Sequence, residues 1–140
     1  MSLMRTLTII KPNGVEQHII GEIIHAFEEY NFQIVAMRML RITKQEAEGF
    51  YIIHRQKHFY DSLTTFMSSG PVVVMVLEAE DVIDRLRDLM GATNPAEAAE
   101  GTLRKRFGTS TERNVIHGSD APETATIEIR YFFSELEILS

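Results

Sequence analysis

The sequence predicts an α+β fold in which helices cover a β-sheet, and three observations favour this class. Residues 71–77, Pro-Val-Val-Val-Met-Val-Leu, form a continuous apolar run that is typical of a strand in the middle of a sheet. Apolar residues from Ile19 to Phe27 repeat at helical spacing. The predicted strands and helices alternate in an order that contains two βαβ halves. Together these patterns indicate a ferredoxin-like sandwich.

The first half of the chain begins with an expected strand around residues 6–9. The turn-forming run Lys-Pro-Asn-Gly at 11–14 ends that strand. The apolar spacing that follows predicts an amphipathic helix over residues 19–30, and residues 32–42 are extended in character. The run Thr-Lys-Gln-Glu at 43–46 has the spacing of a capping box, so we expect another helix to start there.

The middle of the chain contains the strongest strand signal. A short helix over residues 61–67 precedes the apolar strand at 71–77. Asp81 is expected to cap the next helix because its short carboxylate can accept hydrogen bonds from free backbone amides. Gly91 is expected to end that helix because glycine tolerates the left-handed conformation found after helix ends.

The last third of the chain starts with a long segment, residues 92–113, that has no sustained apolar periodicity. One helical turn is expected within it, at residues 102–106. A loop of this length in a compact domain is usually functional. A buried strand at 115–116, a helix over 122–131 and a C-terminal tail at 132–139 complete the predicted elements.

Length and composition limit the class of protein. The chain has 140 residues, 44% of them hydrophobic, so one domain over residues 1–140 is expected. It contains no cysteine, which excludes disulfides and thiolate metal sites. Its apolar runs are too short to cross a bilayer, and the N-terminal residues do not have the pattern of a signal peptide. We therefore expect a cytoplasmic protein that does not bind membranes.

Basic residues gather in one part of an otherwise acidic chain. The net charge is -6, which argues against nucleic-acid binding through the global field. Arg104, Lys105, Arg106 and Arg113 nevertheless lie within ten positions. A local positive patch on an acidic body suits a small polyanion better than a long one, and the alternative is a solvated loop with scattered charges.

The run Asn-Val-Ile-His-Gly-Ser-Asp at 114–120 has the most specific chemical character. It predicts a strand end that presents His117 on a tight turn before a helix, with Pro122 at the first helical position and Ser119 or Asp120 as the cap. A helix N-terminus favours anions such as phosphate, and a neutral imidazole is a competent nucleophile near pH 7. The run fits either a histidine that carries a phosphoryl group or a polar turn with an incidental histidine.

This run closely resembles the active-site segment of the nucleoside diphosphate kinases, whose central motif is Asn-x-x-His-Gly-Ser-Asp. Four further blocks resemble that family in its order and at its spacing: Ile-Ile-Lys-Pro at 9–12, Gly-Pro-Val-Val at 70–73, Gly-Ala-Thr-Asn-Pro at 91–95 and Gly-Thr-Leu-Arg at 101–104. The blocks cover nearly the whole chain, so the resemblance is specific.

The resemblance implies a fold, a reaction and partners. The implied fold is the ferredoxin-like one with a four-stranded antiparallel sheet. The implied reaction moves the terminal phosphoryl group of a nucleoside triphosphate to a nucleoside diphosphate, by a ping-pong mechanism through a phosphohistidine and with broad base and sugar tolerance. Mg²⁺ enters bound to the nucleotide phosphates, and the chain assembles into a tetramer or a hexamer. No specific nucleic-acid partner is expected.

The resemblance also implies roles for individual residues. His117 matches the phosphoryl carrier, which attacks through its δ nitrogen, and the matching catalytic positions are Lys11, Tyr51, His117, Ser119 and Glu128. Ser119 and Glu128 match the pair that orients the ring. The matching nucleotide-binding positions are Lys11 and Asn114 for the sugar, Phe59 and Leu63 for the base, and Arg87, Thr93 and Arg104 for the phosphates.

Without the resemblance, several of these residues have ordinary interpretations. Glu128 could be a solvated helix residue, and Arg87 could form a surface salt bridge with Asp84 or Asp88 on its own helix. Phe59 could be a core aromatic. Two other function classes also remain open at this point: a nucleotide-binding module that has lost catalysis, and a nucleic-acid binder that uses the basic cluster.

Some positions depart from the family pattern. Asn13 stands where the family usually has aspartate, His58 where it has proline, and Thr111 where it often has valine. These departures bear on nucleotide affinity more than on phosphoryl transfer. His54 and His58 have i,i+4 spacing, but no third ligand accompanies them, so no protein metal site is expected.

Overall fold

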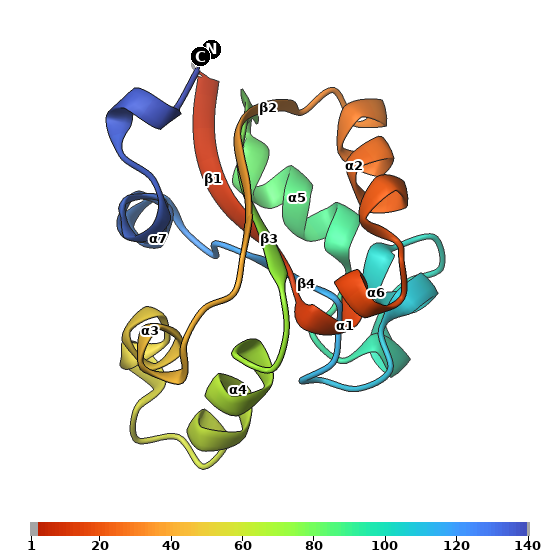
Figure 1. Cartoon of the computed structure of the whole chain (residues 1–140). Helices are drawn as coiled ribbons and strands as arrows, with labels where there is room; N and C mark the ends of the chain where they lie inside the picture. Colours follow the sequence, from red (N-terminus) through yellow and green to blue (C-terminus); the bar gives the residue numbers. More distant parts are fainter. Residues whose placement is uncertain (1–2, 140) are drawn as a thin grey trace.

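The computed structural model describes residues 3–139 of the chain. Its strands are β1 (Leu3–Ile10), β2 (Gln33–Leu40), β3 (Val72–Glu80) and β4 (Ile116–Gly118), and they form one sheet in the order β2-β3-β1-β4. Every neighbouring pair in this sheet is antiparallel (Figure 1). This is the strand order of the ferredoxin-like fold, so the predicted fold class is confirmed.

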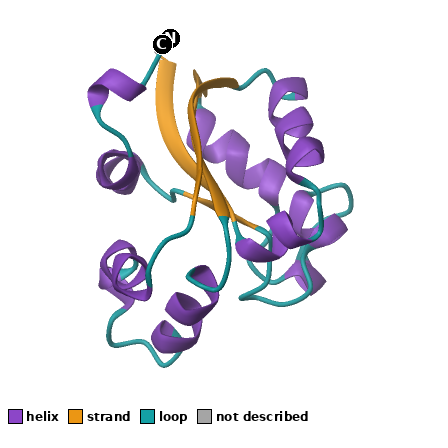
Figure 2. Cartoon of the chain, viewed as in Figure 1, coloured by secondary structure: helices purple, strands orange, loops and turns teal. Residues whose placement is uncertain are grey.

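Helices connect the strands and lie against the sheet (Figure 2). The α-helices are α1 (Pro12–Glu16), α2 (Ile20–Glu29), α3 (Lys44–Phe50), α4 (Tyr60–Met67), α5 (Val82–Met90), α6 (Leu103–Phe107) and α7 (Pro122–Phe132). Short 3₁₀ turns are η1 (Ile52–His54), η2 (Pro95–Glu97) and η3 (Glu135–Glu137). The helices expected at 19–30, 61–67 and 122–131 are thus present with small shifts at their ends.

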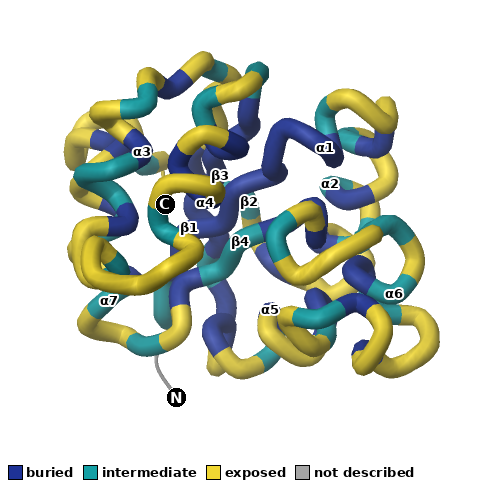
Figure 3. Tube along the Cα trace, turned by 90° about the horizontal axis from the view of Figure 1, so that it is seen from below, coloured by how far each residue is buried: buried dark blue, intermediate teal, exposed yellow. Residues whose placement is uncertain are grey.

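Alternation along β3 divides the apolar core into two layers. Val73, Met75 and Leu77 pack with α2 and α5 on one face of the sheet. Val72 and Val74 pack with α3, α4 and α7 on the other face. Both faces are covered because β3 lies inside the sheet, which explains its continuous apolar run. Figure 3 shows buried residues along the strands and exposed residues on the outer helices and loops.

The N-terminus of α3 has the capping box that the sequence predicts. The Thr43 hydroxyl accepts a hydrogen bond from the Glu46 amide at 3.0 Å, and the Glu46 carboxylate accepts one from the Thr43 amide at 2.8 Å. Two amides that the helix leaves free are therefore satisfied by side chains. This fixes the start of the helix whose other end reaches the cavity described below.

Replacement Thr43→Ala is expected to lower the free energy of unfolding by about 1 kcal/mol, because it removes one half of this box. Urea unfolding followed by circular dichroism measures the change. Thr126→Ala is a matched control, since the Thr126 hydroxyl donates to the Pro122 carbonyl inside α7 and caps nothing. An equal loss in both variants would contradict the capping role of Thr43.

Two predicted caps are wrong. Asp81 does precede α5, but its side chain makes no capping hydrogen bond and its backbone is left-handed, with a φ of 52°. Helix α7 has Ala121 as its N-cap, so neither Ser119 nor Asp120 occupies that position. Instead, Thr124 accepts a hydrogen bond from the Ala121 amide at 3.1 Å. The Ser119 hydroxyl instead donates a hydrogen bond to Glu128.

The predicted turn at 11–14 and the predicted strand at 115–116 also need correction. The turn is the start of α1, because Pro12 takes the first helical position. Strand β4 begins one residue later than expected, since Val115 has a φ of 67°, which a β-branched residue rarely adopts. The Val115 carbonyl accepts a hydrogen bond from the Lys11 amide at 2.8 Å. This strained backbone lies two residues before His117.

Candidate functional site

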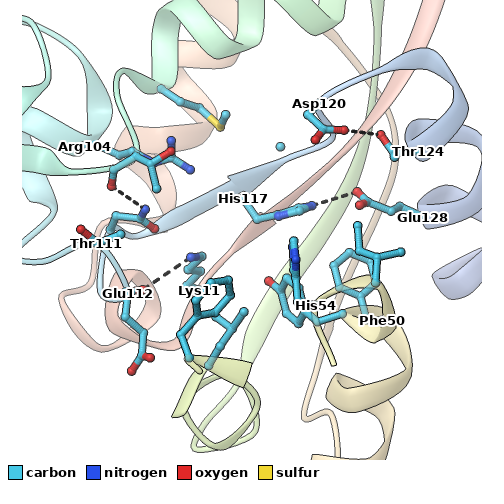
Figure 4. A pocket seen from close by; sticks show the side chains of 18 of the residues that line it. Lys11, Phe50, His54, Arg104, Thr111, Glu112, His117, Asp120, Thr124 and Glu128 are labelled. Carbon is cyan, nitrogen blue, oxygen red and sulfur yellow. Dashed lines mark hydrogen bonds and ion pairs between the residues drawn. The ribbon is translucent and has the colours of Figure 1, made fainter. Parts of the chain in front are cut away.

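A cavity of about 650 Å³ opens beside the end of β4, and nearly all the predicted site residues line it (Figure 4). The lining residues that the sequence predicted are Lys11, Tyr51, Phe59, Leu63, Arg87, Thr93, Arg104, Asn114, His117 and Glu128. They come from segments that are far apart in the chain, and the sheet brings them together. Ser119 is buried beneath this surface and contacts Glu128.

His117 lies in the middle of β4 and pairs with Ile9 of β1. Because Ile116 packs into the α2 and α5 layer, strand alternation turns the next side chain toward α3 and α7. The Thr8 hydroxyl donates a hydrogen bond to the His117 carbonyl at 2.8 Å. The histidine backbone is thus held by strand pairing and by a side chain of the neighbouring strand.

Glu128 fixes which nitrogen of the imidazole is free. Its Oε1 lies 2.8 Å from His117 Nε2 and also accepts a hydrogen bond from the Ser119 hydroxyl at 2.7 Å. A carboxylate only accepts hydrogen bonds, so Nε2 carries the proton of the neutral ring. The lone pair of the neutral imidazole is therefore on Nδ1. The structure decides this point, which the residues of the motif leave open.

Glu128 is consequently no solvated helix residue. Its side chain is 16% exposed and that of His117 is 17% exposed, so the pair is largely shielded from water. Glu128 reaches His117 from the second turn of α7, which begins at Pro122. A hydrogen bond in such surroundings holds the ring more firmly than one in bulk water.

Lys11 carries an unusual cation at the floor of the cavity. Its residue is 6% exposed, and its Nζ donates to the Glu112 carbonyl at 3.5 Å. Burial lowers the pKa of Lys11 to about 7, and the nearby Arg104 guanidinium lowers this pKa further while Glu112 opposes both effects. An anionic ligand in the cavity would favour the protonated form and raise this pKa.

Lys11→Met is expected to stabilise the protein without nucleotide by an amount on the order of a few kcal/mol near pH 6.5. Between about pH 7 and 10.5 the unfolded chain holds a proton on Lys11 that the folded chain lacks. The free energy of unfolding of wild type therefore rises with pH in this window. Below about pH 7 both states are protonated, and the full cost of burying the charged ammonium is present. Chemical unfolding at pH 6.5 and pH 10 measures the difference, which should shrink at the higher pH. Parallel pH dependence in both proteins would contradict burial of the charge.

Arg104 and Arg87 supply the positive potential at the other side of the cavity. Arg104 is 8% exposed, and two of its guanidinium nitrogens donate to the carbonyls of Gly91, at 3.0 Å, and Ile116, at 2.7 Å. Burial lowers the pKa of Arg104 to about 10, with a further contribution from Arg87, so the group remains charged. Across residues 3–139, Arg87 forms no ion pair with Asp84 or Asp88.

The expected basic patch is not a continuous surface. Only Arg104 of the cluster lines the cavity. Arg106 lies 3.4 Å from Glu22 and stacks on the Phe107 ring, and Arg113 stacks on the Phe66 ring. The fold therefore disperses the charges that are close in sequence. This dispersal removes the main support for a nucleic-acid binder.

The segment just before β4 is tied to two other parts of the chain, the loop at Thr93 and the start of α1. The side-chain amide of Asn114 donates a hydrogen bond to the Thr93 carbonyl at 2.9 Å. The side-chain amide of Asn13 donates one to the Arg113 carbonyl, also at 2.9 Å. Asn13 thus serves as a donor where the family usually has a carboxylate, which cannot donate.

Three polar atoms around the cavity are buried and have no partner within residues 3–139. They are the Tyr51 hydroxyl, Arg104 Nε and Asn114 Oδ1. Burial raises the pKa of Tyr51, and the Glu128 charge raises it further, so the phenol stays protonated. Buried polar groups without partners are costly unless a ligand satisfies them. Their position indicates that the cavity receives a polar ligand.

The far end of the cavity has an aromatic wall. Phe59 is 37% exposed, so it is not a core aromatic, and its ring lies 5.5 Å from His54 and 5.6 Å from His58. Leu63 is buried beside it, and Thr111 lines the cavity as well. A half-exposed phenyl ring at a cavity mouth can stack on a planar base.

Some lining residues were not predicted for the site. Phe50, His54 and Glu112 line the cavity, yet no local pattern marks them, because they reach it only through the packing of α3, η1 and the loop before β4. His54 ends a 3₁₀ turn, and no helix runs on from it to His58. Within residues 3–139, no group of histidine and acidic side chains could hold a metal ion. No helix in that range could span a membrane.

The family model for nucleoside diphosphate kinase matches residues 4–138. The chain belongs to this family. A nucleoside diphosphate kinase from Desulfosudis oleivorans is 60% identical over 135 residues, covering 96% of this chain and 97% of that relative. A second, from Persephonella marina, is 52% identical over 139 residues, covering 99% of each.

Solved nucleoside diphosphate kinase structures have the same fold. The Aquifex aeolicus enzyme superposes with a TM-score of 0.97 at 45% identity, covering 99% of this chain and 100% of that one. The Halobacterium salinarum enzyme, solved in complex with CDP, superposes with a TM-score of 0.95 at 37% identity, covering 99% and 93%.

The predicted family and reaction are therefore confirmed. The enzyme is a phosphotransferase that moves the terminal phosphoryl group of a nucleoside triphosphate to a nucleoside diphosphate, through a phosphohistidine and in two successive half-reactions. Nucleoside diphosphate kinases need a divalent cation for this reaction. The alternative function, a nucleotide-binding module that has lost catalysis, is not supported.

Proposed function

We propose that His117 is the residue that carries the phosphoryl group, and that its Nδ1 is the attacking atom. The observation that carries this proposal is the hydrogen bond from Nε2 to Glu128, which leaves Nδ1 unprotonated in the neutral ring. Nδ1 attacks the γ-phosphorus of the triphosphate, the bond from phosphorus to the bridging oxygen breaks, and the diphosphate leaves. A second diphosphate then attacks the phosphohistidine, so one site serves donor and acceptor in turn.

Glu128 and Ser119 orient the ring and balance its charge. When Nδ1 binds phosphorus, the imidazole becomes positive, and the carboxylate on Nε2 stabilises that positive charge. The Ser119 hydroxyl holds the same carboxylate oxygen in place. Neither residue contacts the phosphorus, so both act through the orientation and charge of His117.

The cations of the cavity are assigned to the phosphates. Arg87, Arg104 and Thr93 hold the phosphate chain, and Lys11 and the Tyr51 hydroxyl lie near the transferred group. In phosphoryl transfer the protein contributes mainly positioning and charge stabilisation. Arg104 stays charged, an anionic ligand would favour the protonated form of Lys11, and the protonated Tyr51 can donate a hydrogen bond.

The remaining assignments concern the nucleoside and the metal. Phe59 stacks on the base with Leu63 beside it, and Asn114 with Lys11 binds the sugar. Stacking is tolerant of base identity, so broad base and sugar tolerance is expected. The CDP complex of the Halobacterium salinarum relative supports a nucleotide in this cavity. The divalent cation is proposed to be Mg²⁺ that arrives on the substrate phosphates, since they provide oxygen ligands.

Residues 1–140 are proposed to work as one domain in a cytoplasmic homo-oligomer, either a tetramer or a hexamer. The exposed Met37 and Met39 on the edge strand β2 are consistent with a contact between copies. Analytical ultracentrifugation distinguishes the two assemblies by mass. A monomer at micromolar concentration would contradict this part of the proposal.

Labelling with γ-³²P-ATP in the absence of an acceptor tests the proposed carrier. The enzyme is expected to hold a phosphate that is labile in acid and stable in base, as a phosphoramidate is, and peptide mapping should locate it on His117. Addition of dTDP should then move the label to dTTP. A label that is stable in acid, or one located on another peptide, would overturn the assignment of His117.

A further inference from the structure

Phe50 lies against the face of the site where His117 and Glu128 meet (Figure 4). It is the last residue of α3, it is half-buried, and its ring centroid is 5.2 Å from that of His117, with an interplanar angle of 72°. Its ring also contacts Tyr131 and Phe132 of α7, at 5.7 Å and 5.2 Å. One side chain therefore joins α3, α7 and the imidazole.

The hydrogen bond to Glu128 does not by itself define the plane of the imidazole. That bond restrains one edge of the ring, at Nε2, while the ring can still tilt about its Cβ–Cγ bond. Phe50 and Tyr51 both meet the imidazole almost perpendicularly, with Tyr51 at 6.0 Å and 88°. These two rings also meet each other at 4.9 Å and 90°. Together they restrict the tilt from two directions.

The end of α3 is itself fixed against α7. The Tyr131 hydroxyl donates to the Glu46 carbonyl at 2.7 Å, crossing from one helix to the other. Gly49 makes this approach possible, because a Cβ at this position would come within 2.5 Å of the Tyr131 hydroxyl. The backbone that presents Phe50 is therefore held to the helix that presents Glu128.

We propose that Phe50 is a positioning residue for phosphoryl transfer, whose ring holds the His117 imidazole in the plane that directs Nδ1 at the incoming phosphorus and keeps Nε2 on Glu128. This inference rests on the proposed role of His117. Phe50 supplies no charge and no proton, so its contribution lies in the orientation of the nucleophile.

Phe50→Leu tests this inference because leucine keeps an apolar side chain but removes the flat ring. The rate of His117 phosphorylation by ATP in a single turnover is expected to fall about 10-fold, while the dissociation constant for ADP changes less than about two-fold. The ¹⁵N spectrum of the His117 ring should move from the Nε2–H tautomer toward an average of both tautomers. Phe50→Tyr retains the ring and should retain the rate.

Phe133→Leu is the matched control. Phe133 is buried in the same core layer, under the Arg38 guanidinium, and it belongs to none of the groups assigned to the site. The Phe133→Leu variant should be less stable than wild type, but it should keep the wild-type rate of His117 phosphorylation and the wild-type tautomer of the His117 ring. If Phe50→Leu is phosphorylated at the wild-type rate with an unchanged ¹⁵N spectrum, or if Phe133→Leu loses as much rate, the inference is wrong.

The two levels of failure are distinguishable. Failure of the proposed function shows in wild type, where the label is then absent from His117. Failure of the positioning role leaves wild type labelled on His117 and Phe50→Leu labelled equally fast. If Phe50→Leu does not fold, Phe50→Met takes its place, and the ¹⁵N spectrum of that variant decides the outcome.

Discussion

His117→Ala is expected to abolish phosphate exchange between ATP and dTDP, with a loss of roughly 10⁴-fold or more. The reaction passes through a covalent intermediate, so removal of the carrier removes both half-reactions and not merely one contact. The cations and the aromatic wall of the cavity are unchanged in this variant. The dissociation constant for ADP, measured by calorimetry, should therefore remain within about three-fold of wild type.

His25→Ala is the matched control for this variant. His25 lies on α2 and faces solvent beside Glu29, away from the cavity. Its replacement should leave exchange and labelling unchanged. Substantial residual exchange in His117→Ala would mean that another residue carries the phosphoryl group, and a large loss of ADP affinity would mean that the substitution had disturbed the cavity itself.

Glu128→Gln is expected to lower the rate of His117 phosphorylation by about 10²- to 10³-fold. Two losses act together. The amide no longer provides the negative charge that stabilises the positive phosphoimidazole. In one of its two orientations its NH₂ group also faces Nε2, which favours the tautomer with a proton on Nδ1. That tautomer has no lone pair on the attacking atom.

The measurement is single-turnover labelling by ATP across pH 6–9, with ADP affinity measured in parallel. Glu123→Gln is the control, since Glu123 is exposed in the first turn of the same helix. It removes an equal charge from α7 without touching the imidazole. A similar rate loss in the two variants would mean that the general field of the helix matters and that the direct bond to His117 does not.

Most of the sheet and its helices could be predicted from the chain alone. The apolar run that became β3 and the amphipathic segment that became α2 are local patterns, because burial on one or both faces imposes the period of the structure on the sequence. The box at Thr43 is local too, since its partners are three residues apart. Asp81 shows the limit of local patterns: it does precede α5, but its backbone is left-handed and its side chain makes no capping hydrogen bond.

Apart from His117, most residues of the candidate site are assigned by the resemblance, because their spacing carries no chemical signal of its own. Glu128 on a helix is an ordinary polar residue until the sheet places it 2.8 Å from His117. Phe50 carries no signal at all, because its contacts with the imidazole exist only when α3 packs beside β4. The basic cluster shows the opposite case, in which residues close in sequence have different partners in the fold: Arg106 lies beside Glu22, and Arg113 stacks on Phe66.

The fold class, the order of the elements and the position of the candidate histidine can be predicted from the chain alone, because they depend on periodicity and on a short contiguous motif. Folding sets which nitrogen is free, how far Lys11 is desolvated and which aromatic rings lie against the imidazole. The physical reason is that protonation and orientation depend on contacts across the molecule, between atoms that the chain separates by many residues.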